Sequence, residues 1–165
     1  MNQSMQLGTW LPRLALLLPV LVSTALGFGS GSGILHAQVA VVVSLESPLT
    51  EITLDDLRGM YLGKLTRLET GERVVLLESP RVREAFYHAA LRMNPDRVKR
   101  HWIGMVFSGA GVIPPREIAN AEELRRYVSG RPGAIAFLAA DAVGPDVRIL
   151  RVDGLRPSDA DYPIR

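Results

Sequence analysis

Cysteine is absent from this chain of 165 residues, which excludes thiolate metal sites, disulfides and lipid attachment through a cysteine. No charge of one sign dominates, because 19 lysine and arginine residues stand against 17 acidic residues, for a formal net charge of +2. Aromatic residues make up only 6% of the chain and are not interleaved with a basic cluster. The composition therefore gives no reason to expect a nucleic-acid partner.

Catalytic signatures are missing as well. The sequence contains no G-x-S-x-G, Walker A or H-E-x-x-H pattern. His88 and His101 are the only histidines beyond residue 37, and no triad or metal geometry can be assembled around them. We interpret both as surface residues and expect no enzymatic activity, no catalytic residue, no metal site and no cofactor.

Long hydrophobic runs are lacking, apart from one short run near the start of the chain. Arg13 precedes the apolar stretch Leu14–Leu26, which at about 13 residues is shorter than the roughly 20 needed to cross a bilayer. This pattern predicts a secretory signal peptide, followed by a flexible glycine-rich stretch at 27–33. Cleavage is expected after Ala37, with Ala25 as the second candidate.

The chain therefore divides into a signal peptide with a flexible leader at 1–37 and an α/β domain at 38–165. We expect a periplasmic or secreted protein, with an uncleaved N-terminal membrane anchor as the alternative. Runs rich in apolar and β-branched residues predict the strands of the domain. These strands are Val39–Val43, Val74–Leu77, Gly133–Leu138 and Val147–Val152.

The stretch TLDDLRGMYLGKLTR at 53–67 predicts a helix with defined ends. Thr53 and Asp56 form a capping-box pattern at its start, and Ile52 can pack onto Leu57 as a hydrophobic staple. Gly63 is placed to end the helix in a left-handed turn.

Three further helices are predicted from their first residues. Ser79-Pro80 and Asn94-Pro95 each combine an N-cap with a proline in the first turn, and Asn120 with Glu123 forms a third capping pattern. Periodicity predicts that the helix after Asn94 buries Val98, Trp102, Met105 and Val106. Strands that alternate with helices indicate a two- or three-layer α/β domain.

A candidate anion site lies at the turn around Ser79. Free backbone N–H groups and the positive end of a helix suit phosphate, sulfate or carboxylate, while Ser79 adds a hydroxyl and Arg81 a guanidinium. In the structural alternative, Ser79 only caps its helix and Arg81 faces water. Glu78 and Pro80 both count against an anion at this turn, through a negative charge and a missing N–H.

The loop that contains Ser108, Gly109 and Gly111 is a second candidate. Glycine-rich backbone can fold into a nest of N–H groups around an anion. The structural alternative is a connector that glycine makes flexible. We therefore carry Ser79, Arg81, Ser108, Gly109 and Gly111 forward as candidate ligand-binding residues.

Four ordered motifs resemble the phosphate-type periplasmic solute-binding proteins. They are SLESPLTEITLDDLRGMYLGKLTR at 44–67, SPRVREAFY at 79–87, RPGAIAFL at 131–138 and VDGLRPSDADYPIR at 152–165. Leu68 stands where that family usually has tryptophan. The family's small phosphate-binding turn is replaced here by Ser79-Pro80-Arg81, so only Ser79 carries over.

The resemblance implies a type-2 periplasmic-binding-protein-like fold, with a mixed, mostly parallel sheet flanked by helices. It implies that this chain forms a single lobe of that fold. The implied function is that of a phosphate ABC transporter's substrate-binding component, with phosphate or another small anion as ligand and a membrane transporter or sensor as partner. The alternative is a protein-interaction or sensor-input module, which docks a partner or forms a homodimer through the apolar patch Val112–Pro115.

Overall fold

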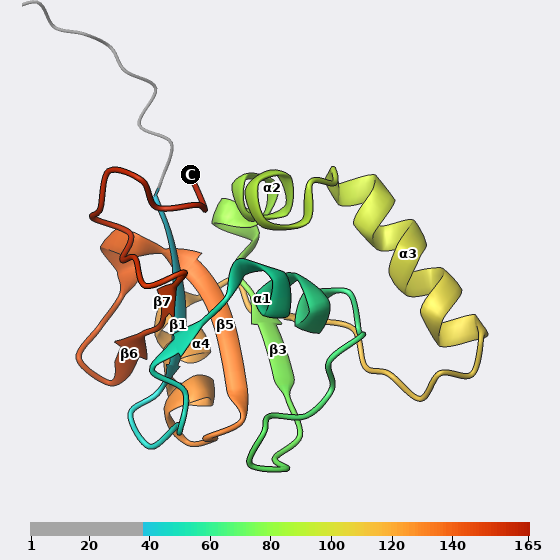
Figure 1. Cartoon of the computed structure of the whole chain (residues 1–165), viewed down its shortest axis with the longest axis horizontal. Coiled ribbons are helices and arrows are strands. Elements are labelled where there is room, and N and C mark those ends of the chain that lie inside the picture. Colours follow the sequence, from blue (N-terminus) through green and yellow to red (C-terminus); the bar gives the residue numbers. More distant parts are fainter. Residues whose placement is uncertain (1–37) are drawn as a thin grey trace, which may run out of the picture. The chain divides into compact units, whose positions relative to one another are not determined.

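The computed structural model describes residues 38–165, so the expected signal peptide and leader at 1–37 lie outside the described residues. A five-stranded sheet forms the centre of the described domain (Figure 1), with the strand order β4-β3-β5-β1-β6. Its strands are β1 Val39–Ser44, β3 Val75–Glu78, β4 Arg116–Glu117, β5 Ala134–Ala139 and β6 Val147–Ile149.

The sheet is mixed and mostly parallel, as predicted. β3 pairs in parallel with both β4 and β5, whereas β1 pairs antiparallel with both β5 and β6. Four strands therefore run in one direction, and only β1 runs in the other. The expected strand at Val39–Val43 is confirmed in the interior of the sheet, between β5 and β6, and all of β1 is buried.

Helices cover both faces of the sheet, which gives three layers. Val41 and Phe137 belong to the apolar core on the face of α1 and α2, whereas Val42 and Leu138 belong to the core on the face of α4. In Figure 1, α1 lies in front of the sheet and α4 behind it, while α2 lies above the upper ends of the strands and α3 extends to one side. The helices are α1 Leu54–Tyr61, α2 Arg83–Phe86, α3 Pro95–Phe107 and α4 Ala121–Ser129.

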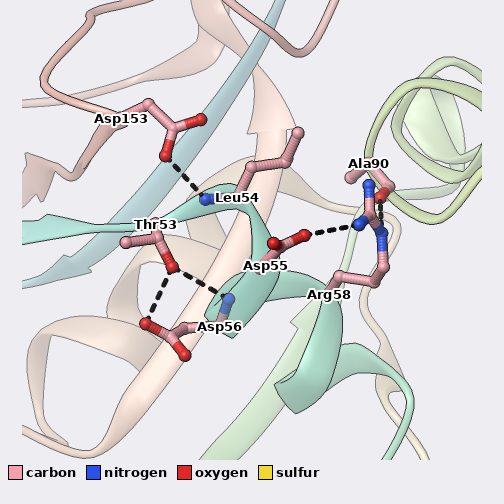
Figure 2. A network of polar contacts seen from close by, with 7 residues as sticks. All are labelled: Thr53, Leu54, Asp55, Asp56, Arg58, Ala90 and Asp153. Atoms are coloured by element: carbon pink, nitrogen blue, oxygen red, sulfur yellow. Dashed lines mark hydrogen bonds and ion pairs between the residues drawn. The ribbon is translucent and has the colours of Figure 1, made fainter.

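The start of α1 is fixed by the predicted cap (Figure 2). The Thr53 hydroxyl oxygen accepts the backbone N–H of Asp56 at 3.0 Å and donates to the Asp56 carboxylate at 2.8 Å. The Asp153 carboxylate accepts the backbone N–H of Leu54 at 3.0 Å, from a turn near the C-terminus. The Thr53 hydroxyl and the Asp153 carboxylate thus accept two backbone N–H groups at the positive end of the helix, and Asp153 ties the helix to the last part of the chain.

The end of α1 is also as predicted. Gly63 has a φ of 73°, and its N–H donates to the carbonyl of Met60 at 2.9 Å. The N–H of Lys64 donates to the carbonyl of Gly59 at 2.8 Å, which completes a Schellman-type ending.

The helix predicted from Pro80 is not one α-helix. The chain instead forms a 3-10 turn at Pro80–Val82, then α2, then a π-helical turn at Tyr87–Leu91. The caps at Asn94 and Asn120 are confirmed, since their side chains accept the backbone N–H groups three residues further on.

Two predictions near the ends of elements need correction. Val106 was predicted to be buried but is 51% exposed, and Met105 is only half-buried, since Val98 and Trp102 are the buried residues of α3. The predicted strand Val147–Val152 is divided between β6 and the short strand β7 Arg151–Val152. The latter pairs in parallel with β2 Glu51–Ile52 in a separate two-stranded sheet.

Candidate functional site

The carboxyl ends of β3, β4 and β5 meet at one edge of the sheet, which we call the carboxyl edge. Ligands of open α/β sheets bind outside such an edge. Ser79 follows β3 directly and is only 4% exposed, and its N–H donates to the carbonyl of Phe137 at 3.1 Å. That amide is therefore already used by the sheet. The Ser79 side chain makes no capping hydrogen bond.

Arg81 lies at the same edge but its guanidinium is occupied. Nη1 and Nη2 donate to the two carboxylate oxygens of Asp141, just beyond β5, at 3.0 and 2.8 Å. Both side chains are more than half exposed, at 58% and 63%. Because the pair is exposed, it contributes little to stability. It nevertheless neutralises the positive charge expected to attract an anion.

A cluster of charged side chains stands beside Ser79. Arg83 Nε lies 3.0 Å from Glu78 Oε1, and Arg83 also donates through Nη2 to Glu117. The Tyr87 hydroxyl donates to the other oxygen of Glu78. With both carboxylates ionised, the cluster carries one net negative charge, which disfavours an anion at this position.

Burial has the largest effect on the pKa values of Glu78 and Tyr87. It raises the pKa of Glu78, against the lowering effects of the Tyr87 hydroxyl and the Arg83 charge. Burial and the neighbouring Glu78 raise the pKa of Tyr87 as well, so its hydroxyl stays protonated and donates. Glu78 could be singled out from the sequence, but its partners Arg83, Tyr87 and Glu117 could not. Glu117 belongs to β4, so no pattern in the sequence around Glu78 indicates that the two side chains lie close together.

Two cavities lie against α3. The first, which we call the α3 groove, has a volume of about 530 Å³ and runs between α3 and the segment 114–117. Glu78 and Glu117 lie at its acidic end, next to Arg83. Its apolar walls consist of Val98, Trp102, Ile103, Val106, Phe107, Pro114 and Pro115.

The second cavity, the arginine cavity, has a volume of about 520 Å³. Arg67, Arg73 and Arg116 line it, together with Tyr127 and Trp102. No aspartate or glutamate is among its lining residues. This cluster was not predicted from the sequence, because its three arginines come from separate segments.

The structure does not bring the predicted site residues together in either cavity. Ser79 and Arg81 are at the carboxyl edge, whereas Ser108, Gly109 and Gly111 follow the end of α3. The glycines have φ angles of 73° and 64°, and the Ser108 hydroxyl donates to the carbonyl of Met105 at 2.8 Å. Of the five residues, only Gly111 lines one of the two cavities, the arginine cavity.

The histidines have different surroundings. His88 is exposed, as predicted, and lies 3.8 Å from Glu84. His101 is half-buried rather than on the surface, because its Nε2 lies 2.9 Å from the carbonyl oxygen of Leu62 at the end of α1. Within residues 38–165, no group of three or more His, Cys, Asp or Glu side chains is arranged to hold a metal. In the same range, no helix has the length and apolar character that a bilayer crossing requires.

The sheet order and the covering helices define a periplasmic-binding-protein-like α/β fold, and solved structures share it. The chain is similar to an ABC-type phosphate transport receptor from Vibrio cholerae, with a TM-score of 0.57 and 16% identity, over 73% of this chain and 48% of that one. It is also similar to a putative phosphate ABC transporter substrate-binding protein with bound phosphate from Clostridium perfringens. There the TM-score is 0.62 and the identity 16%, over 77% and 51% of the two chains. A third likeness is to PstS from Borrelia burgdorferi, with a TM-score of 0.57 and 13% identity, over 77% and 53%.

The resemblance drawn from the sequence motifs is thus confirmed at the level of the fold. The chain spans about half the length of the solved structures it matches. No family model matches the sequence, and no curated protein matches it either.

Proposed function

We propose that the chain is an exported, non-enzymatic solute-binding module that takes a small oxyanion such as phosphate at the carboxyl edge, with low affinity. The observation that carries this proposal is the position of Ser79. It follows the end of an interior parallel strand, where open α/β sheets bind ligands, in a fold shared with a structure that holds phosphate. Arg81 is the second ligand-binding residue of the proposal.

The expected affinity is low for two reasons. Arg81 is paired with Asp141, and the cluster of Glu78, Arg83 and Glu117 carries a net negative charge beside the site. A bound anion must therefore displace the Asp141 carboxylate from Arg81 and lie close to the negatively charged cluster.

Calorimetric titration of the purified protein with phosphate tests the proposal. We expect weak binding that Ser79→Ala weakens further, while Ser129→Ala, which alters a serine on α4, leaves it unchanged. If phosphate up to millimolar concentration produces neither heat nor a change in melting temperature, the proposed phosphate binding is refuted. A membrane transporter or sensor is the proposed partner of the loaded module, in line with the transport receptors that share the fold.

A second function is favoured by the exposed apolar surface of α3. Phe107 is 87% exposed, Val106 51% and Ile103 47%, and Ile113 of the following loop is 69% exposed. We call Ile103 and the residues three and four positions after it on the helix, Val106 and Phe107, the α3 patch. A contiguous apolar patch on an otherwise polar surface is typical of a docking site.

The charges beside the patch indicate what docks there. Lys99 and Arg100 are exposed and lie one or two helical turns before the patch residues, on the same sides of α3. Neither makes an ion pair within the described part of the chain. We therefore propose a protein partner whose apolar contact surface is flanked by carboxylates.

Co-purification from periplasmic extract tests this docking function. We expect one partner, retained in fixed proportion by the original protein and by Leu45→Ser, which alters an exposed leucine away from the patch. Phe107→Ser should not retain this partner, and added salt should weaken its binding to the original protein. If sedimentation instead shows a homodimer that Phe107→Ser dissociates, the patch binds a second copy and the separate partner is refuted. Retention of the same proteins by Phe107→Ser would refute the patch as the contact.

A further inference from the structure

We propose that the arginine cavity is a second binding site, and that its ligand is an organic anion with a carboxylate or phosphate group on an apolar body. Ser79 and Arg81 do not line this cavity. The proposal therefore does not depend on phosphate binding at the carboxyl edge, and the two can fail separately.

Two of the arginines are held face to face. Arg67 and Arg73 are partners in a short antiparallel bridge in the hairpin between α1 and β3. The backbone hydrogen bonds on either side of the pair measure 2.8 and 3.0 Å. This makes Arg67 and Arg73 a non-hydrogen-bonded pair, the kind in which opposite side chains are closest. Like charges in this arrangement are destabilising, and an anion between them removes the repulsion.

The third arginine enters from the edge strand of the sheet. Arg116 belongs to β4, and its guanidinium lies 5.2 Å from the centre of the Tyr127 ring of α4. This cation–π contact holds the side chain beside the cavity without neutralising its charge. On the hairpin side, the Arg67 Nη1 donates to the carbonyl of Gly71 at 2.8 Å, which also leaves the positive charge in place.

No ion pair in the described part of the chain neutralises the charge of the cavity. Arg67, Arg73 and Arg116 make no ion pair within residues 38–165, and no carboxylate lines the cavity. Arg81 and Arg83 at the carboxyl edge are different, because both are engaged by carboxylates. Guanidinium groups form forked hydrogen bonds with carboxylates and phosphates, so three of them in one cavity favour an oxyanion.

The other walls of the cavity indicate that the ligand has an apolar part. Met60, Trp102, Val112 and Ile113 line it, and Gly111 lies at the loop side with its backbone in the left-handed region. A volume of about 520 Å³ is within the range of small-molecule sites and is much larger than a phosphate ion needs. An inorganic anion would leave the apolar walls unused, whereas an organic anion covers them.

A matched pair of fluorescent probes tests the site. Anilinonaphthalene sulfonate carries an anionic group on an aromatic body, and phenylnaphthylamine is the same body without the sulfonate. We expect Arg67→Gln and Arg73→Gln each to weaken sulfonate binding about tenfold, equivalent to about 1.4 kcal/mol. They should leave phenylnaphthylamine binding unchanged. Arg126→Gln, an equal charge change on an exposed part of α4, should affect neither probe.

Competition identifies the ligand class. Octanoate below its micelle concentration and phenyl phosphate should displace the sulfonate probe, and their relative strength separates carboxylate from phosphate ligands. Inorganic phosphate at the same concentration should not displace it. Displacement by inorganic phosphate as effective as by octanoate would overturn the organic-anion class.

Ligand-free stability gives an independent readout. If Arg73 serves binding, Arg73→Gln should melt at the same or a higher temperature at low ionic strength, because it removes repulsion from Arg67. A lower melting temperature would assign the arginine a structural role and overturn the proposal. Equal weakening of both probes, or an effect of Arg126→Gln as large as that of Arg73→Gln, would overturn it too.

Discussion

Gly63 packs directly under Trp102, and this contact joins the end of α1 to α3. A methyl group on Gly63 would lie 3.1 Å from Cη2 and 3.3 Å from Cζ3 of the indole. The glycine also has a φ of 73°, a conformation that side chains of L-residues rarely adopt. The abrupt Gly-Lys turn in the sequence therefore serves two purposes, since it ends α1 and leaves room for the tryptophan that lines both cavities.

Gly63→Ala should therefore destabilise the fold by about 2 kcal/mol, measured as the free energy of unfolding in urea. The left-handed backbone alone accounts for about 1 kcal/mol of this, and displacement of the indole accounts for the rest.

Gly71→Ala is the matched control for this prediction. Gly71 has a φ of 89°, but no atom lies within 4 Å of the position that its Cβ would take. Gly71→Ala should therefore lose only the part of the unfolding free energy that comes from the left-handed backbone. Equal losses in the two variants would show that the contact with Trp102 is not tight in solution.

Local features of the fold were predictable because they depend on neighbouring residues. The caps at Thr53, Asn94 and Asn120 and the left-handed turn at Gly63 each follow from a few adjacent side chains. The predicted burial of Val106 was wrong for a physical reason. Periodicity identifies an apolar stripe on a helix but does not tell whether another element covers it.

The candidate sites were less predictable, since they depend on partners distant in the sequence. Ser79 could be found from its position after a strand, but the pairing of Arg81 with Asp141 spans 60 residues and left no signal. The facing pair of Arg67 and Arg73 depends on the register of a hairpin that the sequence pattern did not indicate. Gly111 was found as an anion candidate, but not its place in the arginine cavity.

Glu78 should make the stability of the protein depend on pH in an unusual direction. Burial raises its pKa in the folded state above the ordinary value of 4.5, to which the unfolded chain returns. The folded protein therefore binds this proton more tightly than the unfolded chain does. The contribution of Glu78 to stability rises as the pH falls from neutral through the raised pKa, and it levels off below 4.5.

Urea unfolding of the original protein and of Glu78→Gln, at several values between about pH 7 and about pH 5, measures this effect. The difference in unfolding free energy should change in favour of the original protein as the pH falls. Each tenfold difference in proton affinity between folded and unfolded states corresponds to about 1.4 kcal/mol. A difference that stays constant, or that favours Glu78→Gln at lower pH, would contradict the raised pKa.

Phe107 should contribute to association but not to folding. Because its side chain is 87% exposed, Phe107→Ser should change the free energy of unfolding by less than about 0.5 kcal/mol. Val112 is a poorer choice for such a test, since it is half-buried and packs against the core. A loss above about 1 kcal/mol for Phe107→Ser would mean that the patch supports the fold rather than a partner.

Asp141 should act as an internal competitor of the proposed phosphate site. Its carboxylate takes both forked donors of Arg81, so Asp141→Asn should free the guanidinium and strengthen phosphate binding about three- to tenfold. The exposed pair contributes little to stability, and the variant should remain folded. Calorimetry with phosphate measures the gain, and the double variant Arg81→Gln with Asp141→Asn should abolish it. Glu122→Gln removes one negative charge from exposed α4. If it reproduces the gain, the gain reflects the overall charge and Arg81 is not a ligand.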